Sequence, residues 1–459
     1  MDLVIRHGTL VTASDTVTAD LGIRAGKIAQ VGGALPKAKR ELDAAGMLVM
    51  PGAIDVHTHM EMPFMGTSTA DDFLTGTRAA AAGGVTCLID FAIQPPQTSL
   101  LKTLEIWKQK AAGKATIDYS FHLALTHWDD TIPQQVRTLI ELGFPSLKVF
   151  MAYKGALMLE DAGLLQLLQT SRELGALVMV HAENGDAIFT LQQQALARNE
   201  TSPRYHALTR PRIAEGEATA RAIALAEIAG APLYVVHVSC QEAMDAIAAA
   251  RRRKVPIYGE SCPQYLGAIS VDDYERPDFE GAKFVCSPPL RELDQAKQLW
   301  SGLAGNLLQA VSSDHCPFRM EQKRAGFNDF TLIPNGVPGI ETLVPLVWTL
   351  GVEAGHISPN RFVDLISTRP ARLFGLAPRK GSLTVGADAD IMIFDPQREV
   401  TLHHTGLHQN LDYTPYEGFR VTGYPATTLS RGDIVWHEGE ITAAAGRGEL
   451  VQRKSFSGD

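Results

Sequence analysis

Short apolar runs separated by longer helix-like stretches fill the middle of the chain, from about residue 51 to residue 375. The runs predict eight strands, one leading into His57 and then 85–89, 119–125, 146–150, 176–180, 233–236, 256–259 and 309–312. Helices are predicted between them, including 72–82, 100–112, 132–142, 161–174 and 215–228. Eight alternating units favour an α/β fold with a closed TIM-like (β/α)8 barrel over an open doubly wound sheet.

The two ends of the chain show a different pattern, of short strands punctuated by Gly and Asp. Residues 1–50 hold several such strands, and similar segments return at 390–395, 421–423 and 433–436. Neither end has enough strands to bury a core alone, so we expect one β-sandwich built from both. The predicted organisation is 1–50 and 376–442 for the sandwich, 51–375 for the catalytic barrel, and 443–459 for a C-terminal arm suited to subunit contacts.

Composition narrows the class of protein. The 459 residues are 45% hydrophobic and 20% charged, which is typical of a globular protein with a large core. A net charge of −9 disfavours nucleic acid and anionic membrane as general partners. The only basic cluster, 251–254, closes the predicted helix 241–250, where cations suit the helix C-terminus. The chain has no glycine-rich dinucleotide or phosphate loop.

Five scattered cysteines without a Cys-x-x-Cys pair indicate free thiols in a reducing compartment. Charge interrupts the N-terminus before a signal-peptide core can form, and no apolar run reaches the ~20 residues that a membrane-spanning helix needs. We therefore expect a cytoplasmic protein.

Ligand-type side chains gather where the predicted strands end. Because functional residues of such a barrel lie at the carboxyl ends of its strands, these positions predict one site. They are His57, His59, Asp90, Lys148, His181, His237, Glu260 and Asp314. Alternate strand residues share a face, so His57 and His59 project together and form a pair that suits zinc. A single histidine here would more often belong to the core, but four histidines, a lysine and an aspartate together predict a metal centre.

Lys148 lies inside the apolar strand 146–150. A buried ammonium beside metal cations would be repelled and desolvated, so an unmodified lysine is unsuitable as a ligand. A neutral amine can add carbon dioxide to give a carbamate, whose two oxygens could bridge two metals. The alternatives are a lysine that reaches the barrel mouth and, less compatible with a metal cluster, a Schiff-base lysine.

Five motifs together resemble one known family. They are Pro51-Gly52-Ala53-Ile54-Asp55-Val56-His57-Thr58-His59, Phe150-Met151-Ala152-Tyr153-Lys154, Val180-His181-Ala182-Glu183-Asn184, Tyr205-His206-Ala207-Leu208-Thr209-Arg210-Pro211 and Ser287-Pro288-Pro289-Leu290-Arg291. The first is similar to the opening motif of the cyclic amidohydrolases of the amidohydrolase superfamily. The others resemble its dihydropyrimidinase/D-hydantoinase branch, over nearly the whole chain. This resemblance implies hydrolytic opening of cyclic ureides to N-carbamoyl amino acids by a subunit of a homotetramer or dimer.

The resemblance also implies the metal ligands. One divalent ion, with zinc expected, would be held by His57, His59, carboxylated Lys148 and Asp314. A second would be held by Lys148, His181 and His237. A hydroxide bridging the two ions would attack the ring carbonyl, with Asp314 as the proton carrier. Read without the resemblance, Asp314 could instead cap the helix that follows it.

The remaining site residues come from the same resemblance. Tyr153 would bind the developing oxyanion, and backbone groups at Ser287 and Asn335 would contact the ureide. The lining for the exocyclic substituent would come from the stretches that hold Met60, Met62, Phe64, Met65, Phe150 and Leu157. Taken alone, Tyr153 could be one aromatic in a wall, and Asn335 and Ser287 could belong to a turn and a rigid loop. Asp90 and Glu260 stay candidates for supporting or structural positions.

Three related families are alternatives. Dihydroorotases carry an arginine two residues after the second histidine, whereas this chain has Glu61, whose charge would repel a substrate carboxylate. Allantoinases share the metal set, but the apolar lining disfavours a polar ureido arm. Non-catalytic dihydropyrimidinase-like scaffold proteins have lost metal ligands, and all six ligand positions are present here.

Overall fold

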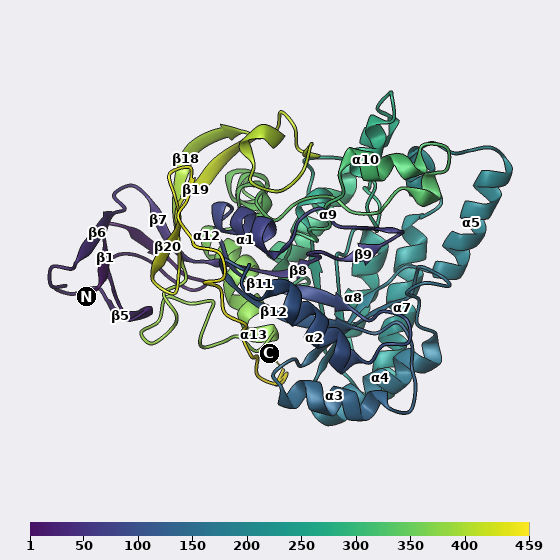
Figure 1. Cartoon of the computed structure of the whole chain (residues 1–459), viewed down its shortest axis with the longest axis horizontal. Helices are drawn as coiled ribbons and strands as arrows, with labels where there is room; N and C mark the ends of the chain where they lie inside the picture. The colour runs from purple at the N-terminus through teal and green to yellow at the C-terminus, as the bar shows by residue number, and fades with distance from the viewer. Residues whose placement is uncertain (459) are drawn as a thin grey trace.

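Eight parallel strands follow one another in sequence order around a barrel in the computed structural model, which describes residues 1–458 (Figure 1). They are β8 (Ala53–Thr58), β11 (Val85–Ile93), β12 (Asp118–Ala124), β13 (Ser146–Phe150), β14 (Leu177–His181), β15 (Leu233–Val235), β16 (Ile257–Ser261) and β17 (Ala310–Val311). The segment after β17 completes the ring, since the amide of His59 donates to the carbonyl of His315 at 2.9 Å. The closed barrel expected from the apolar runs is confirmed.

Helices surround the strands on the outside. The main ones are α1 (Phe73–Ala82), α2 (Leu100–Ala111), α3 (Ile132–Glu141), α4 (Asp161–Leu174), α5 (Gly185–Ala197), α6 (Arg204–Leu208), α7 (Arg212–Ala229), α8 (Gln241–Arg252) and α9 (Leu293–Ala304). Local signals set their ends: Asp72 caps α1 with its carboxylate, and Gly230 ends α7 in a left-handed conformation. Within the described residues, no helix combines the length and hydropathy that a membrane crossing requires.

After β17 the chain runs through short helices that complete the barrel wall. They are α10 (Met320–Lys323), α11 (Leu343–Val347), α12 (Pro359–Val363) and α13 (Arg369–Leu373). A two-stranded ribbon, β9 (Pro63–Phe64) with β10 (Thr67–Ser68), follows β8. The strands themselves are buried on both faces, as β11 illustrates with nine buried residues out of nine. This double burial explains why they read as continuous apolar runs.

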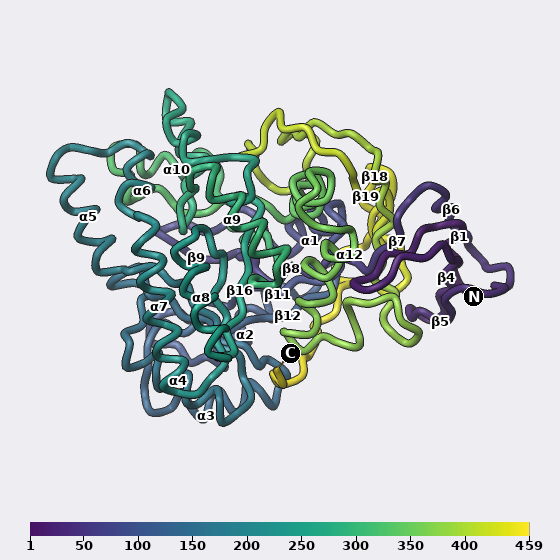
Figure 2. Tube along the Cα trace, turned by 180° about the vertical axis from the view of Figure 1, so that it is seen from behind, coloured from purple at the N-terminus to yellow at the C-terminus, as the bar shows by residue number. Residues whose placement is uncertain are grey.

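Two further sheets lie beside the barrel, at the opposite end of the molecule from α5 (Figures 1 and 2). The first has the order β5-β4-β1-β6 and the second the order β21-β20-β19-β18-β7-β2-β3. Their bounds are β1 (Leu3–Arg6), β2 (Thr9–Val11), β3 (Thr16–Thr18), β4 (Leu21–Arg24), β5 (Lys27–Val31), β6 (Arg40–Asp43), β7 (Leu48–Pro51), β18 (Ile391–Thr401), β19 (Arg420–Ser430), β20 (Asp433–His437) and β21 (Glu440–Ile441).

Both chain ends contribute to this sandwich, as expected. β7 pairs with β18 in the seven-stranded sheet, and side chains from both ends share one core, including Leu3, Val49, Ile391 and Leu429. The four-stranded sheet differs in that all its strands come from the N-terminal end.

A buried lysine joins the sandwich to the barrel. The ammonium of Lys380 is 1% exposed and donates to Asp118 at 2.7 Å, to Asp390 at 2.6 Å and to Asp388 at 3.1 Å. Asp118 opens β12 of the barrel, whereas Asp390 directly precedes β18 of the sandwich. Three carboxylates therefore share one cation at the junction.

The C-terminal tail covers the amino-terminal end of the barrel. The amide of Val451 donates to the carbonyl of Tyr119 at 2.7 Å, and the amide of Tyr119 donates to the carbonyl of Glu449 at 3.0 Å. The guanidinium of Arg453 is inserted behind this contact, where it donates to Phe121 O at 2.6 Å and to Ser146 Oγ at 2.7 Å. The segment that the sequence suggested as an arm for subunit contacts thus packs against its own barrel.

Candidate metal centre and substrate cavity

A cavity opens at the carboxyl ends of the barrel strands. It is lined by His57, His59, Met62, Phe64, Ile93, Lys148, Phe150, Tyr153, Leu157, His181, His237, Ser287, Asp314, Cys316, Asn335 and Gly336. The structure therefore brings together all thirteen site residues that were expected from the sequence. Ile93, Cys316 and Gly336 were not foreseen. Ile93 ends β11, beyond the strand predicted at 85–89, and Gly336 adjoins Asn335, but neither residue type signals a ligand contact by itself.

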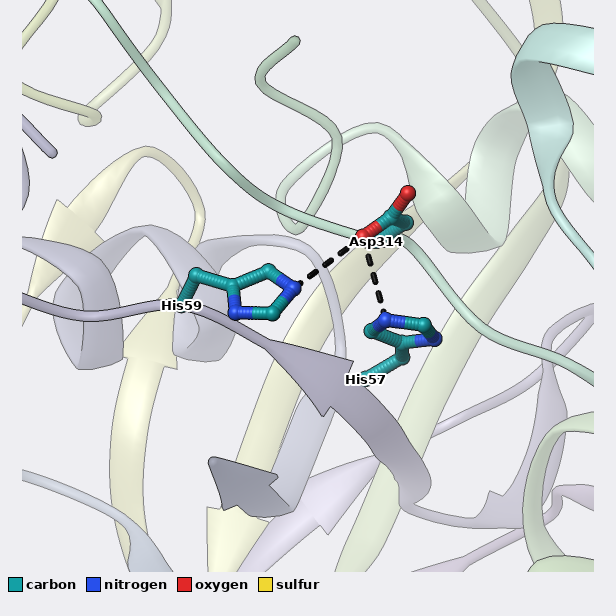
Figure 3. A group of neighbouring side chains, drawn as sticks. All are labelled: His57, His59 and Asp314. Carbon is teal, nitrogen blue, oxygen red and sulfur yellow. Dashed lines mark ion pairs between the residues drawn. The ribbon is translucent and has the colours of Figure 1, made fainter. Parts of the chain in front are cut away.

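Three of these side chains converge on one point (Figure 3). Nε2 of His57 lies 3.2 Å from Oδ1 of Asp314, and Nε2 of His59 lies 3.3 Å from the same oxygen. Both histidines come from the end of β8, while Asp314 comes from the segment that closes the barrel. No helix starts directly after Asp314, since α10 begins at Met320, and the alternative in which Asp314 is only a helix cap is not what the structure shows.

The other three expected ligands lie on the neighbouring strands. Nδ1 of His181 is 2.9 Å from Nε2 of His237, and the rings of His57 and His237 are 5.4 Å apart. The Lys148 side chain is 1% exposed, with its Nζ 5.1 Å from the ring centres of Phe91 and Phe150. In the part of the chain that the structure describes, no carboxylate forms an ion pair with Lys148. This lysine therefore reaches the cavity through an apolar collar.

Carboxylates behind the histidines hold the rings in place. Oε1 of Glu260 lies 2.5 Å from Nδ1 of His57, and Oε2 of Glu183 lies 2.8 Å from Nε2 of His181. Glu183 in turn forms an ion pair with Arg210 at 2.6 Å. Burial alone would raise the pKa of Glu183, but the charge of Arg210 outweighs burial and lowers this pKa to about 2. A carboxylate on the far nitrogen fixes the tautomer and orientation of a ligating imidazole.

The protonation states suit metal binding. Burial lowers the pKa of His57 and of His237 well below the ordinary value, so both imidazoles are neutral with a free lone pair. Burial also lowers the pKa of Lys148 to about 7, which leaves a neutral amine available at neutral pH. Burial alone would raise the pKa of Asp314, but its electrostatic interaction and hydrogen bonding with the imidazoles of His57 and His59 outweigh burial, and the pKa is lowered.

These residues fit a divalent metal ion. The ligand atoms of His57, His59 and Asp314 all lie within 4.8 Å of one another, and all three residues are buried. Two imidazoles and one carboxylate are a donor set that zinc and similar ions accept. His181 and His237 face each other with their ring nitrogens at contact distance, which is a second place where two imidazole donors converge.

Tyr153 lies beside the metal-ligand cluster on the loop after β13. Burial raises the pKa of its phenol to about 12, against the lowering influence of Arg210 and of the nearby Ser287 and Asn335 side chains. The guanidinium of Arg210 stands 5.5 Å from the Tyr153 ring centre. The phenol of Tyr153 is therefore protonated and can donate a hydrogen bond in the cavity.

Four residues singled out from the sequence lie elsewhere. Asp90 binds Thr58 Oγ1 and the Met60 amide, both at 2.8 Å, and supports the end of β8 from behind. Met60 is fully buried in the core, and Met65 lines a second, outer pocket. Glu61 pairs with Lys114 at 3.0 Å and is not one of the lining residues of the central cavity, so the repulsion of a substrate carboxylate by Glu61 was the wrong reason to set dihydroorotase aside.

Comparison with known proteins places the chain. The family model described as "Amidohydrolase family" matches residues 48–435. The chain belongs to the amidohydrolase family, in its hydantoinase/dihydropyrimidinase branch. It is 49% identical to a D-hydantoinase of Geobacillus stearothermophilus over 99% of this chain and 97% of the relative, and 46% identical to a D-hydantoinase of Ralstonia pickettii over 99% and 100%. A dihydropyrimidinase structure from Brevibacillus agri is 49% identical, covers 100% of both chains and superposes with a TM-score of 0.98.

Proposed function

We propose that this amidohydrolase opens cyclic ureides, 5-substituted hydantoins and dihydropyrimidines, to N-carbamoyl amino acids. The observation that carries the proposal is the convergence of His57, His59 and Asp314 with Lys148, His181 and His237 in one cavity. The D-hydantoinase names of relatives at 46% and 49% identity support the same reaction. Cyclic amide hydrolysis adds water across the ring C–N bond, giving a carboxylate and returning a proton to the released nitrogen.

In this proposal six cavity residues would hold two divalent ions. His57, His59, Lys148 and Asp314 would bind one, and Lys148, His181 and His237 the other, with Lys148 as a carbamate. Zinc is the expected ion because most of the donors are imidazoles. When bound, such ions lower the pKa of water to near neutrality and polarise a carbonyl.

The chain's own groups complete the reaction. Asp314, ionised and facing the cavity, accepts the proton of the attacking water and delivers it to the ring nitrogen as the C–N bond breaks. The Tyr153 phenol donates a hydrogen bond to the oxygen that gains negative charge. Backbone groups at Ser287 and Asn335, which flank that phenol, bind the ureide edge and set the carbonyl in line for attack.

The cavity walls favour apolar ring substituents. Met62, Phe64, Phe150 and Leu157 line the cavity together with Ile93, and an outer pocket shares Phe64, Tyr153, Leu157 and Asn335 with it. A wall of this kind receives hydrogen, alkyl or aryl groups and leaves the polar ureido arm of allantoin unsatisfied. Allantoinase activity is therefore the less favoured alternative.

A parallel assay tests the proposal. Purified, metal-analysed protein is given dihydrouracil, 5-phenylhydantoin, unsubstituted hydantoin and allantoin, and chiral analysis of the product from racemic 5-phenylhydantoin gives the preferred enantiomer. Turnover of the first three with about two metal ions per subunit is expected. Turnover of allantoin alone would contradict the apolar pocket assigned to the ring substituent. Protein that holds no metal and turns over no substrate would instead support a non-catalytic scaffold protein.

We also propose that the chain assembles as a homotetramer or dimer in the cytoplasm. Large apolar side chains are exposed on the outer helices α5, α6 and α7, with Phe189 46%, Leu208 55% and Ile213 66% exposed. Apolar groups presented together on a surface favour association between subunits. Light scattering after gel filtration measures the subunit number, and a monomeric mass would contradict this proposal.

A further inference from the structure

Lys323, at the end of α10, is a fully buried lysine that the proposed reaction does not use. Its side chain is 0% exposed, and its Nζ donates three hydrogen bonds to backbone carbonyls. The acceptors are Val285 O at 3.0 Å, Pro334 O at 3.0 Å and Gly336 O at 2.9 Å. A lysine is seldom fully buried without a carboxylate partner, and none pairs with Lys323 within residues 1–458.

The three carbonyls belong to the two segments that carry Ser287 and Asn335. Val285 lies two residues before Ser287, and Pro334 and Gly336 flank Asn335 on either side. The segments also bind each other, because the amide of Gly336 donates to the carbonyl of Val285 at 2.9 Å. One ammonium group thus connects both walls of the expected ureide site.

The segments that Lys323 joins, which we call the Lys323 hub, also contact the segment that carries Asp314. The amide of Cys316 donates to the carbonyl of Val337 at 3.0 Å. Gly336 has φ +153°, and a Cβ placed there would lie 2.2 Å from the carbonyl oxygen of Cys316, so the backbones are in close contact. The 334–337 segment therefore also lies against the chain two residues beyond Asp314.

The geometry uses the charged form of the lysine. An ammonium has three N–H donors and satisfies all three carbonyls, whereas a neutral amine could donate only two of these bonds. Burial acts in the opposite direction and lowers the pKa of Lys323 to about 7. The three aligned acceptors favour the ammonium locally, since hydrogen bonds to a charged donor are the stronger ones.

We propose that Lys323 is a positioning residue for ureide recognition, whose three hydrogen bonds hold Ser287 and Asn335 at the spacing that the substrate ring requires. This inference rests on the proposed function. Polar groups that bind the ureide before and during the reaction lower KM more than they raise kcat, because they stabilise both states alike. Loss of the hub should therefore weaken substrate binding first.

The test compares Lys323→Met with a matched control. Methionine keeps the apolar stem and removes all three bonds, and Lys380→Met does the same to a buried lysine at the junction between sandwich and barrel. For Lys323→Met we expect KM for hydantoin and dihydrouracil to rise about tenfold, roughly the effect of one lost hydrogen bond, with kcat within about threefold and metal content unchanged. Lys380→Met should lower Tm but leave KM within about twofold.

Rescue and a substrate-free readout complete the design. Lys323→Arg keeps a cationic donor and should recover part of the lost KM. Amide hydrogen exchange should accelerate at 285–288 and 334–337 in Lys323→Met and not in Lys380→Met. If the methionine variant does not fold, Lys323→Arg is compared with the wild type in both measurements, and its KM and exchange rates should rise by less than the change expected for methionine, because its planar donor group meets only part of the three carbonyls.

The outcomes separate this inference from the proposed function. An unchanged KM in a folded Lys323 variant, or an equal rise of KM in Lys380→Met, overturns the positioning role. A wild-type protein that opens no cyclic ureide overturns the proposed function instead. Hydrogen exchange then still decides whether Lys323 holds the two segments, since it needs no substrate.

Discussion

The Oε1 atom of Glu260 lies 2.5 Å from Nδ1 of His57, and the phenol of Tyr234 donates to the other carboxylate oxygen at 2.9 Å. Glu260 is fully buried at the end of β16, so a side chain on one strand orients the ring of His57, which lies on β8. Nε2 of the same ring points at Asp314. Glu260 therefore contacts the proposed metal centre through His57.

Glu260→Gln should weaken metal binding about 10- to 100-fold, the usual effect of losing a carboxylate behind a ligating histidine. Glutamine keeps the shape of the side chain but places an amide where the carboxyl group of Glu260 faces Nδ1 of His57. Competition with a chelator measures the affinity. Glu341→Gln is the matched control, because Glu341 is equally buried and pairs with His408 at 2.8 Å, outside the cavity. Equal metal affinity in both variants would contradict the assigned role of Glu260.

Lys148→Ala should abolish turnover and remove the metal ion that depends on the bridging carbamate, while the barrel stays folded. The reason is that Lys148 is the one residue expected to bind both ions. Circular dichroism checks the fold, and elemental analysis counts the metal ions per subunit. Full activity in this variant would contradict the proposal of a centre with two metal ions.

Metal uptake by metal-free protein in bicarbonate buffer should rise between pH 6 and pH 8. The pKa of Lys148 is lowered to about 7, so the amine is mostly protonated at pH 6 and mostly neutral at pH 8, and only the neutral form adds carbon dioxide. His57 and His237 do not explain such a step, because their pKa values lie well below the ordinary one and both are already neutral. Carbon-13 NMR of labelled bicarbonate would report the carbamate. Uptake that is flat across this range, or that falls with pH, would contradict the carbamate.

Tyr153→Phe should lower kcat by roughly 10² to 10³, the scale of one lost oxyanion donor, with little change in metal content. The pKa of Tyr153 is raised to about 12, so the phenol stays a donor throughout the neutral range. Steady-state kinetics on 5-phenylhydantoin measures the loss. A change smaller than about threefold would remove Tyr153 from the mechanism.

The barrel and the gathering of histidines, Lys148 and Asp314 in its cavity were predictable because both follow from local patterns. Doubly buried strands read as apolar runs, and a histidine or lysine directly after such a run is conspicuous, as at His181 and His237. The sequence marked Glu260 only as a supporting or structural candidate. Its partner His57 is 203 residues away in the chain, and one sequence does not show which strand ends face each other.

Other features leave no local pattern at all. Lys323 lies in a four-residue helix and binds backbone carbonyls, which every residue type possesses. Glu61 was judged by its charge, but its neutralising partner Lys114 lies on another element. The tail, over its described residues 443–458, forms no strand of its own; it is held by two backbone bonds to Tyr119 of β12 and by backbone bonds to several loops. Such long-range pairings become visible only in three dimensions.

Arg453→Met should destabilise the protein by about 2–4 kcal/mol, because it leaves several buried acceptors at the foot of the barrel without a donor. Arg453 is 4% exposed, and its guanidinium binds Ser120, Phe121 and Ser146 with no carboxylate paired to it in the described part of the chain. Thermal unfolding at fixed metal content measures the change. Arg420→Met is the control: Arg420 is a largely exposed arginine on β19, 3.6 Å from Glu399, and its loss should cost no more than about 0.5 kcal/mol. If both variants unfold at the wild-type temperature, the contacts of the tail do not stabilise the barrel. Any stabilisation by the tail would then have to come from contacts with another subunit.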